Sequence, residues 1–188
     1  MDELKSVKKE FAYYKHLGEK AIEQVPDEML NWKYNEESNS IAVIIKHLAG
    51  NMNSRWTDFL SDDGEKPWRN RDAEFENNID SREELIGIWE KGWSCLFNTL
   101  NKLKKNDLKK TVYIRNQGHT VMEAILRQLA HYSFHIGQIV FIAKLICGKE
   151  WQTLSIPKGE SAQFNDKAFE KPQRNEHFTD NILKDDDS

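Results

Sequence analysis

One long apolar stretch, residues 121–147, constrains the fold more than any other part of this chain. It contains no proline, and it is preceded by Thr120 with Glu123 three positions later, the pair that forms a helix capping box. Gly148 follows at a position where helices commonly end. The stretch therefore predicts a single long helix, which must pack against other elements to cover its apolar sides.

Four polar residues interrupt this stretch at helical spacing: Arg127, His131, His135 and Gln138. Residues three or four apart lie on the same side of a helix, so these side chains form one polar line. The two histidines are one turn apart, and their imidazoles can reach the same metal ion. The pair alone is a weak signal, because residue 132 is Tyr and not the Glu of an HExxH metalloprotease helix.

His47 is the candidate for a third ligand. It lies in a second amphipathic stretch, residues 41–60, with Asn51 one turn later. Three imidazoles suit Zn(II), Ni(II) or Fe(II) and leave a coordination position open, as catalytic sites require. The alternative for His47 alone is a hydrogen-bonded histidine at a seam between helices. The other three histidines are not expected to bind the metal: His16 is interpreted as a surface residue, His119 as a structural residue just before the last helix, and His177 as part of the tail.

Periodic apolar residues predict four amphipathic helices, at about residues 3–24, 41–60, 81–105 and 121–148. Ser81 and Glu84 have the spacing of another capping box, at the start of the third helix. A short strand-like pair lies between the last two helices, in residues 111–120. We therefore predict an all-α fold, an up-down four-helix bundle with long connections.

Two segments lie outside this helical pattern. Residues 61–79 are rich in charge yet keep Trp68 and Phe75, and their length fits either a lid over a site or a solvated loop. The chain then ends in a polar extension. Residues 1–165 are predicted to form the folded domain, and residues 166–188 a polar C-terminal tail.

Composition narrows the possible functions. The formal net charge is −4 at pH 7, which argues against a nucleic-acid partner. No apolar run is expected to reach the length of a membrane span, and the first residues lack the apolar centre of a signal peptide, so no membrane association is expected. Cys95 and Cys147 lack the spacing of a metal or redox motif. They are interpreted as reduced thiols, which predicts a cytoplasmic protein.

Several motifs together resemble the DinB/YfiT-like superfamily, over about residues 5–165. The shared pattern contains Leu-Asn-Trp at residues 30–32, His47 within Lys-His-Leu-Ala-Gly, and the later His131 and His135 followed by Ile-Gly-Gln. A branch of unassigned function is more similar still, and three segments carry that likeness: residues 50–56, 63–69 and 154–159. The resemblance implies a four-helix bundle, often homodimeric, with a divalent metal on three histidines that match His47, His131 and His135.

The superfamily includes transferases and isomerases that use low-molecular-weight thiols, and many members without a known reaction. The resemblance therefore implies an enzyme whose metal activates a thiol or water toward a small-molecule substrate. Arg127 would bind a carboxylate of the thiol or substrate, Asn51 would orient a ligand, and Gln138 completes the polar line. Glu65 or Glu74 could serve as a base. The alternative is a non-catalytic metal-binding or structural bundle protein.

A homodimer is also expected. Four tryptophans offer more aromatic surface than a bundle of this size needs to bury: Trp56, Trp68, Trp89 and Trp93. Aromatic surface is enriched in protein interfaces. The superfamily resemblance points the same way.

Overall fold

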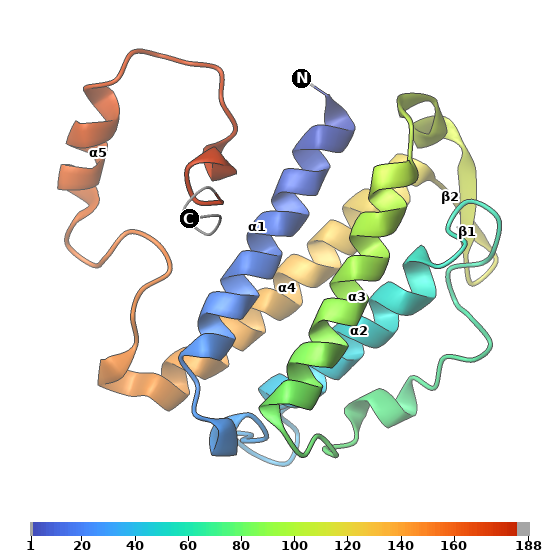
Figure 1. Cartoon of the computed structure of the whole chain (residues 1–188), viewed down its shortest axis with the longest axis horizontal. Coiled ribbons are helices and arrows are strands. Elements are labelled where there is room, and N and C mark those ends of the chain that lie inside the picture. Colours follow the sequence, from blue (N-terminus) through green and yellow to red (C-terminus); the bar gives the residue numbers. More distant parts are fainter. Residues whose placement is uncertain (1, 184–188) are drawn as a thin grey trace.

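The computed structural model describes residues 2–183, and most of these residues are helical. Four long helices lie against one another (Figure 1). Their bounds are α1 Glu3–Glu23, α2 Ile41–Trp56, α3 Arg82–Lys102 and α4 Val121–Cys147. The prediction of a predominantly helical fold is confirmed, and the four stretches expected to be helical are the four long helices.

Helices α2 and α3 run in the same direction, as the hydrogen bonds at their two ends show. Ser40, the N-cap of α2, donates through Oγ to Asn77 Oδ1 just before α3 (3.2 Å). At the other ends, Thr99 Oγ1 donates to the carbonyl of Trp56 (2.8 Å). The long connection 57–81 therefore returns the chain to its starting end, and a strict up-down alternation of successive helices is not observed between α2 and α3 (Figure 1).

The helix boundaries follow the capping residues of the sequence. Thr120 and Glu123 form a complete capping box at the start of α4. Ser81 accepts from the Glu84 backbone N–H at the start of α3, but the Glu84 carboxylate accepts from Asp80 instead of returning to Ser81. Gly148 ends α4 with a positive φ of 54°. Capping chemistry of this kind is local, which is why the sequence predicts it well.

A two-stranded antiparallel hairpin precedes α4. It consists of β1 Thr111–Ile114 and β2 Gln117–Thr120, joined by a two-residue turn in which Arg115 and Asn116 both have positive φ. Asp63 accepts hydrogen bonds from the backbone N–H groups of both turn residues, each at 2.8 Å. The carboxylate thus stabilises the turn and ties the hairpin to the 57–81 connection.

Three of the four tryptophans that suggested an interface are core residues. Trp56, Trp89 and Trp93 are at most 1% exposed, and only Trp68 lies at the surface. Trp89 and Trp93 contact each other edge to face, and Trp93 contacts Tyr132 of α4 in the same way. This packing corrects the argument made from the sequence, because those rings stabilise the core of the chain itself.

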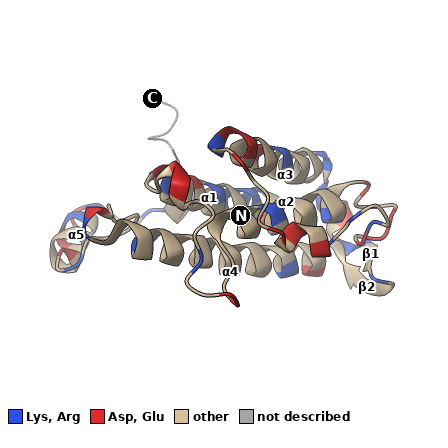
Figure 2. Ribbon diagram, turned by 90° about the horizontal axis from the view of Figure 1, so that it is seen from below, with Lys and Arg blue, Asp and Glu red and all other residues tan. Residues whose placement is uncertain are grey.

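One side of α4 carries part of the exposed apolar surface. Four of its large apolar side chains are at least half exposed: Leu126, Phe134, Phe141 and Leu145. Few charged residues mark the ribbon of α4 in Figure 2. Within residues 2–183, the stretch Val121–Glu150 is the one helix with the length and mean hydropathy of a membrane span, properties that core helices share. The sequence expectation that no apolar run reaches this length is therefore corrected for this stretch.

The C-terminal part leaves the four helices and then returns. Helix α5, Ser161–Phe169, crosses the boundary expected between domain and tail, and its residues are exposed. A short turn at Phe178–Asp180 packs back on α1, where Phe178 contacts Tyr13 edge to face and Asp180 pairs with Lys9. Part of the predicted polar tail is therefore packed on the helices (Figure 1).

Candidate metal centre

Three histidines from two helices converge on one point. His47 comes from α2, and His131 and His135 come from α4, where they lie one turn apart. The Nε2 atom of His131 is 3.3 Å from that of His47 and 3.1 Å from that of His135. One nitrogen from each ring lies within 4.8 Å of the others, close enough for a shared metal ion. The structure thus brings together all three predicted ligands.

Two side-chain oxygens orient the rings of His47 and His135. The Nδ1 atom of His47 is 3.0 Å from Glu74 Oε2, and the Nδ1 atom of His135 is 2.7 Å from Gln138 Oε1. Because these oxygens can only accept, each Nδ1 carries the proton, and each Nε2 directs a lone pair inward. An N–H on His131 can satisfy one of these lone pairs at a time, whereas a divalent cation satisfies all three nitrogens. The donor set fits such an ion, and partners of this kind commonly orient metal-bound histidines.

Glu74 is itself held by several contacts. Arg69 donates to both of its carboxylate oxygens, at 2.7 and 2.9 Å, in the forked geometry typical of strong Arg–carboxylate pairs. Gly50 of α2 makes room for it, since a Cβ at that position would lie 2.1 Å from Glu74 Oε1. Lys46 binds the carbonyls of Ala73 and Glu76 on either side. The charged segment 61–79 is therefore docked on α2 through these contacts, while many of its residues stay exposed.

Burial and charge set the protonation states that metal ligands need. Burial, with the proximity of His135 and His47, lowers the pKa of His131 from its ordinary value to about 3. Burial also lowers the pKa of His135. Burial alone would raise the pKa of Glu74, but hydrogen bonds from His47 and Arg69 outweigh it and hold that pKa below its usual range. At neutral pH, His131 and His135 are therefore neutral beside an ionised Glu74, as metal binding requires.

A hydrogen-bonded chain supports the site from the core side. The indole N–H of Trp56 donates to Tyr132 Oη, and this hydroxyl donates to Asn51 Oδ1, each at 3.0 Å. Burial raises the pKa of Tyr132 well above its usual range, so the hydroxyl stays protonated. Asn51 lines the cavity beside the histidines, as predicted. Tyr132, where an HExxH motif has its Glu, therefore holds Asn51 in place.

A cavity of about 380 Å³ opens beside the three histidines. Besides them and Asn51, its lining contains five arginines: Arg55, Arg69, Arg71, Arg115 and Arg127. Arg127, the arginine predicted to bind substrate, is exposed and lines this cavity. Its guanidinium lies 3.1 Å from His119 Nε2. Glu65 pairs with Arg55 and Arg115, at 3.0 and 3.1 Å. Glu65 and Glu74, the two carboxylates considered as a base, are therefore both paired with arginines.

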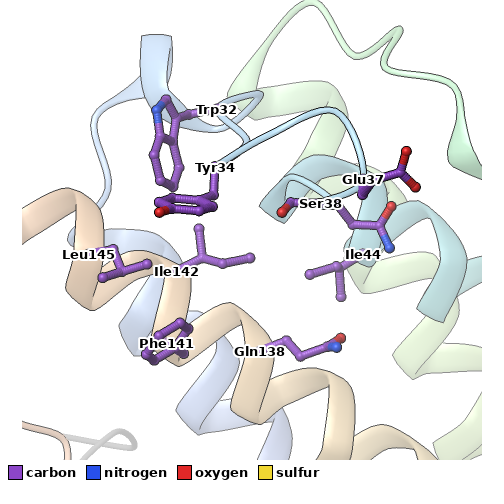
Figure 3. A pocket seen from close by; sticks show the side chains of 10 residues that line it. Trp32, Tyr34, Glu37, Ser38, Ile44, Gln138, Phe141, Ile142 and Leu145 are labelled. Atoms are coloured by element: carbon purple, nitrogen blue, oxygen red, sulfur yellow. The ribbon is translucent and has the colours of Figure 1, made fainter.

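Gln138 lies on the other side of His135 from this cavity. Its side chain accepts from His135 Nδ1 and also borders a second, more apolar hollow of about 580 Å³ between α4 and residues 32–39 (Figure 3). The aromatic rings of Trp32, Tyr34 and Phe141 line that hollow. Gln138 therefore positions a histidine through this contact, and it does not line the cavity that Arg127 borders.

Sequence reasoning missed or misassigned three residues of the site. Arg69 and Glu74 were considered only as charged residues of a possible lid, and Glu74 also as a base, because their contacts with the centre depend on how segment 61–79 folds. Gln128 was overlooked although it lies three positions before His131 on the same side of the helix, a spacing that could have identified it. Its side chain is 4% exposed and lines the cavity.

The fold and the site together define a mostly helical protein with a three-histidine candidate metal centre between α2 and α4. The chain belongs to the family described as "Protein of unknown function (DUF1572)", which matches residues 1–160. No curated protein and no solved structure shows significant similarity to the chain.

Proposed function

We propose that this protein is a divalent-metal-dependent enzyme acting on a small molecule, built as a four-helix bundle of the DinB/YfiT type. The convergence of the three histidines carries the proposal. His47, His131 and His135 offer their Nε2 atoms to one point at the wall of a polar cavity. Three protein ligands leave a position for a reactant, which is the arrangement of catalytic and not of structural sites. A Zn, Ni or Fe ion bound there would supply Lewis acidity that ionises a thiol or water at neutral pH.

The surrounding residues have separate roles in this proposal. Glu74 and Gln138 fix the orientation of two imidazoles through their Nδ1 protons. Asn51, whose Oδ1 is occupied by Tyr132, has its amide N–H groups available to orient a ligand or stabilise developing negative charge. Arg127 at the cavity wall would bind an anionic group of the reactant. In this proposal each of these side chains binds the reactant or positions a metal ligand, and none of them is a nucleophile.

A non-catalytic metal-binding or structural protein is the second candidate. Metal binding by the three histidines does not by itself exclude it, since a protein can hold an ion without turning over a substrate. The arginine-lined cavity favours the enzyme, because a purely structural ion needs no space for a reactant beside it. Gln138 does not add to this argument, since it borders the other hollow.

Turnover of an electrophilic aromatic acceptor tests the proposal. The metal-loaded protein is assayed with several low-molecular-weight thiols and with none, beside His135→Ala. Turnover that requires a thiol and is lost in His135→Ala supports a thiol transferase. Turnover that needs no thiol and is lost in His135→Ala supports a hydrolase. Activity that survives in the metal-free variant refutes the metal mechanism. A fully metal-loaded protein without turnover of any acceptor favours the non-catalytic candidate.

A further inference from the structure

The cavity beside the histidines has more positive than negative side chains. Its five arginines face two carboxylates, Glu65 and Glu74. Glu74 is occupied by Arg69 and His47, and Glu65 by Arg55 and Arg115. These ion pairs neutralise Arg55, Arg69 and Arg115 in part, and the two remaining arginines of the lining keep their positive charge.

Two arginines of the lining have no acidic partner among residues 2–183. Arg71 packs its guanidinium over the ring of Phe75, 5.5 Å from the centroid, and forms no ion pair there. Arg127 contacts only the imidazole of His119. Both are exposed on the same cavity, one from the 57–81 connection and one from α4. Two guanidinium groups without carboxylates, facing one cavity, form a site for an oxyanion.

Gln128 adds an independent requirement. Gln128 is only 4% exposed, and its side chain lines the same cavity. Its Oε1 atom has no hydrogen-bond partner among the described residues. A buried amide oxygen without a donor is costly, and a donor on a molecule in the cavity would remove that cost. The oxygen cannot bind an anion itself. Gln128 Oε1 would therefore accept a hydrogen bond from an O–H or N–H group of a molecule bound in the cavity.

We propose that the cavity binds a small oxyanion that also carries a hydrogen-bond donor, such as a hydroxycarboxylate or a protonated phosphate. Arg71 and Arg127 bind the oxyanion, and Gln128 Oε1 accepts from the donor, beside the histidine nitrogens. The inference rests on the proposed function, since it assigns the substrate class of that same site. Carboxylate and phosphate share the chemistry that a guanidinium fork recognises.

Calorimetric titration of the Zn²⁺-loaded protein at low ionic strength tests the inference. Acetate, glycolate and inorganic phosphate are the probes, and Arg71→Gln/Arg127→Gln is the main variant. The double variant should bind glycolate and phosphate at least about tenfold more weakly, because each lost charge-assisted contact is worth a factor of this order. The matched control is Arg174→Gln in the C-terminal segment, which removes charge outside the cavity and should leave every affinity unchanged. Tighter phosphate or tighter glycolate binding identifies which oxyanion the site prefers.

Gln128→Leu tests the donor requirement separately. It should weaken glycolate and phosphate, which carry an O–H group, and leave acetate unchanged, which carries none. Zinc content is measured on every protein, so loss of the metal is distinguished from loss of the anion site. Failure of the wild type to bind any probe at millimolar concentration would overturn the inference even where zinc is bound. Equal affinities in the wild type and the double variant would overturn it as well.

Discussion

At the scale of single residues, Glu74 is the contact through which the 57–81 connection orients the histidine site. Replacing it by Gln removes the negative charge behind His47 and the ion pair with Arg69. We expect Zn²⁺ affinity to fall by about 10- to 100-fold, the usual effect of losing such a partner. Competition with a chelating dye measures the affinity. The exposed Glu76 gives a matched control, since Glu76→Gln in the same segment should change it little; equal losses in both variants would count against the orienting role.

Asp63 provides a pH-dependent prediction at the same scale. Burial alone would raise its pKa, but hydrogen bonds from the backbone N–H groups of Asn116, Glu65 and Arg115 hold it below the ordinary value. A lowered pKa means that the ionised carboxylate stabilises the folded state above the unfolded pKa of about 3.9 and loses this effect as pH falls through the folded pKa. Urea unfolding should therefore show Asp63→Asn to be less stable near pH 7, with the difference shrinking below about pH 4. A difference independent of pH would contradict this account.

The site residues that could be predicted from the sequence are those whose contacts join residues close together in the chain. His131 and His135 share a helix face by spacing alone, and Thr120 caps its own helix. His47 was a candidate from its place in the amphipathic stretch 41–60, and the superfamily resemblance supported it. Glu74 contacts His47 across 27 positions of chain, and this contact arises only after segment 61–79 folds against Gly50. No periodicity encodes such a contact, which is why it could not be predicted.

At the scale of elements, the close approach of α2 and α3 depends on Gly92. A Cβ there would lie 2.9 Å from the Cα of Ala49 on α2, a backbone atom that cannot turn aside. Gly92→Ala should therefore lower the free energy of unfolding by about 1–3 kcal/mol. Gly87 on the same helix has nothing within 4 Å of its Cβ position, so Gly87→Ala should stabilise by up to about 1 kcal/mol. Urea denaturation of both variants checks the pair, and destabilisation of equal size would contradict the packing argument.

The arrangement of elements was only partly predictable. The four amphipathic stretches and the strand-like pair appear as α1 to α4 and the β1–β2 hairpin. The parallel course of α2 and α3 was not foreseen, because it depends on where the 57–81 connection docks. Lys46 holds that connection against α2, and Asp63 ties it to the β1–β2 hairpin; both contacts join residues far apart in sequence.

At the scale of the whole molecule, the homodimer stays a prediction, now located on the outer side of α4. Phe134 and Phe141 are 63% and 62% exposed there, a cost that a second copy would remove. Sedimentation equilibrium should show a species of twice 22.1 kDa for the wild type and a monomer for Phe134→Lys/Phe141→Lys. Phe169→Lys is the control, since Phe169 is 81% exposed on α5. A wild type that stays at 22.1 kDa at micromolar concentration would refute the dimer.

The metal content of the protein tests the central claim most directly. Protein purified without a metal-affinity tag is dialysed against Zn²⁺, Ni²⁺ or Fe²⁺ and then measured by elemental analysis, beside His131→Ala. The three converging nitrogens predict about one divalent ion per chain in the wild type. His131→Ala should lose that ion while keeping its helical circular dichroism spectrum. A folded wild type that retains none of these ions, or a variant that binds them equally well, would contradict the three-histidine centre.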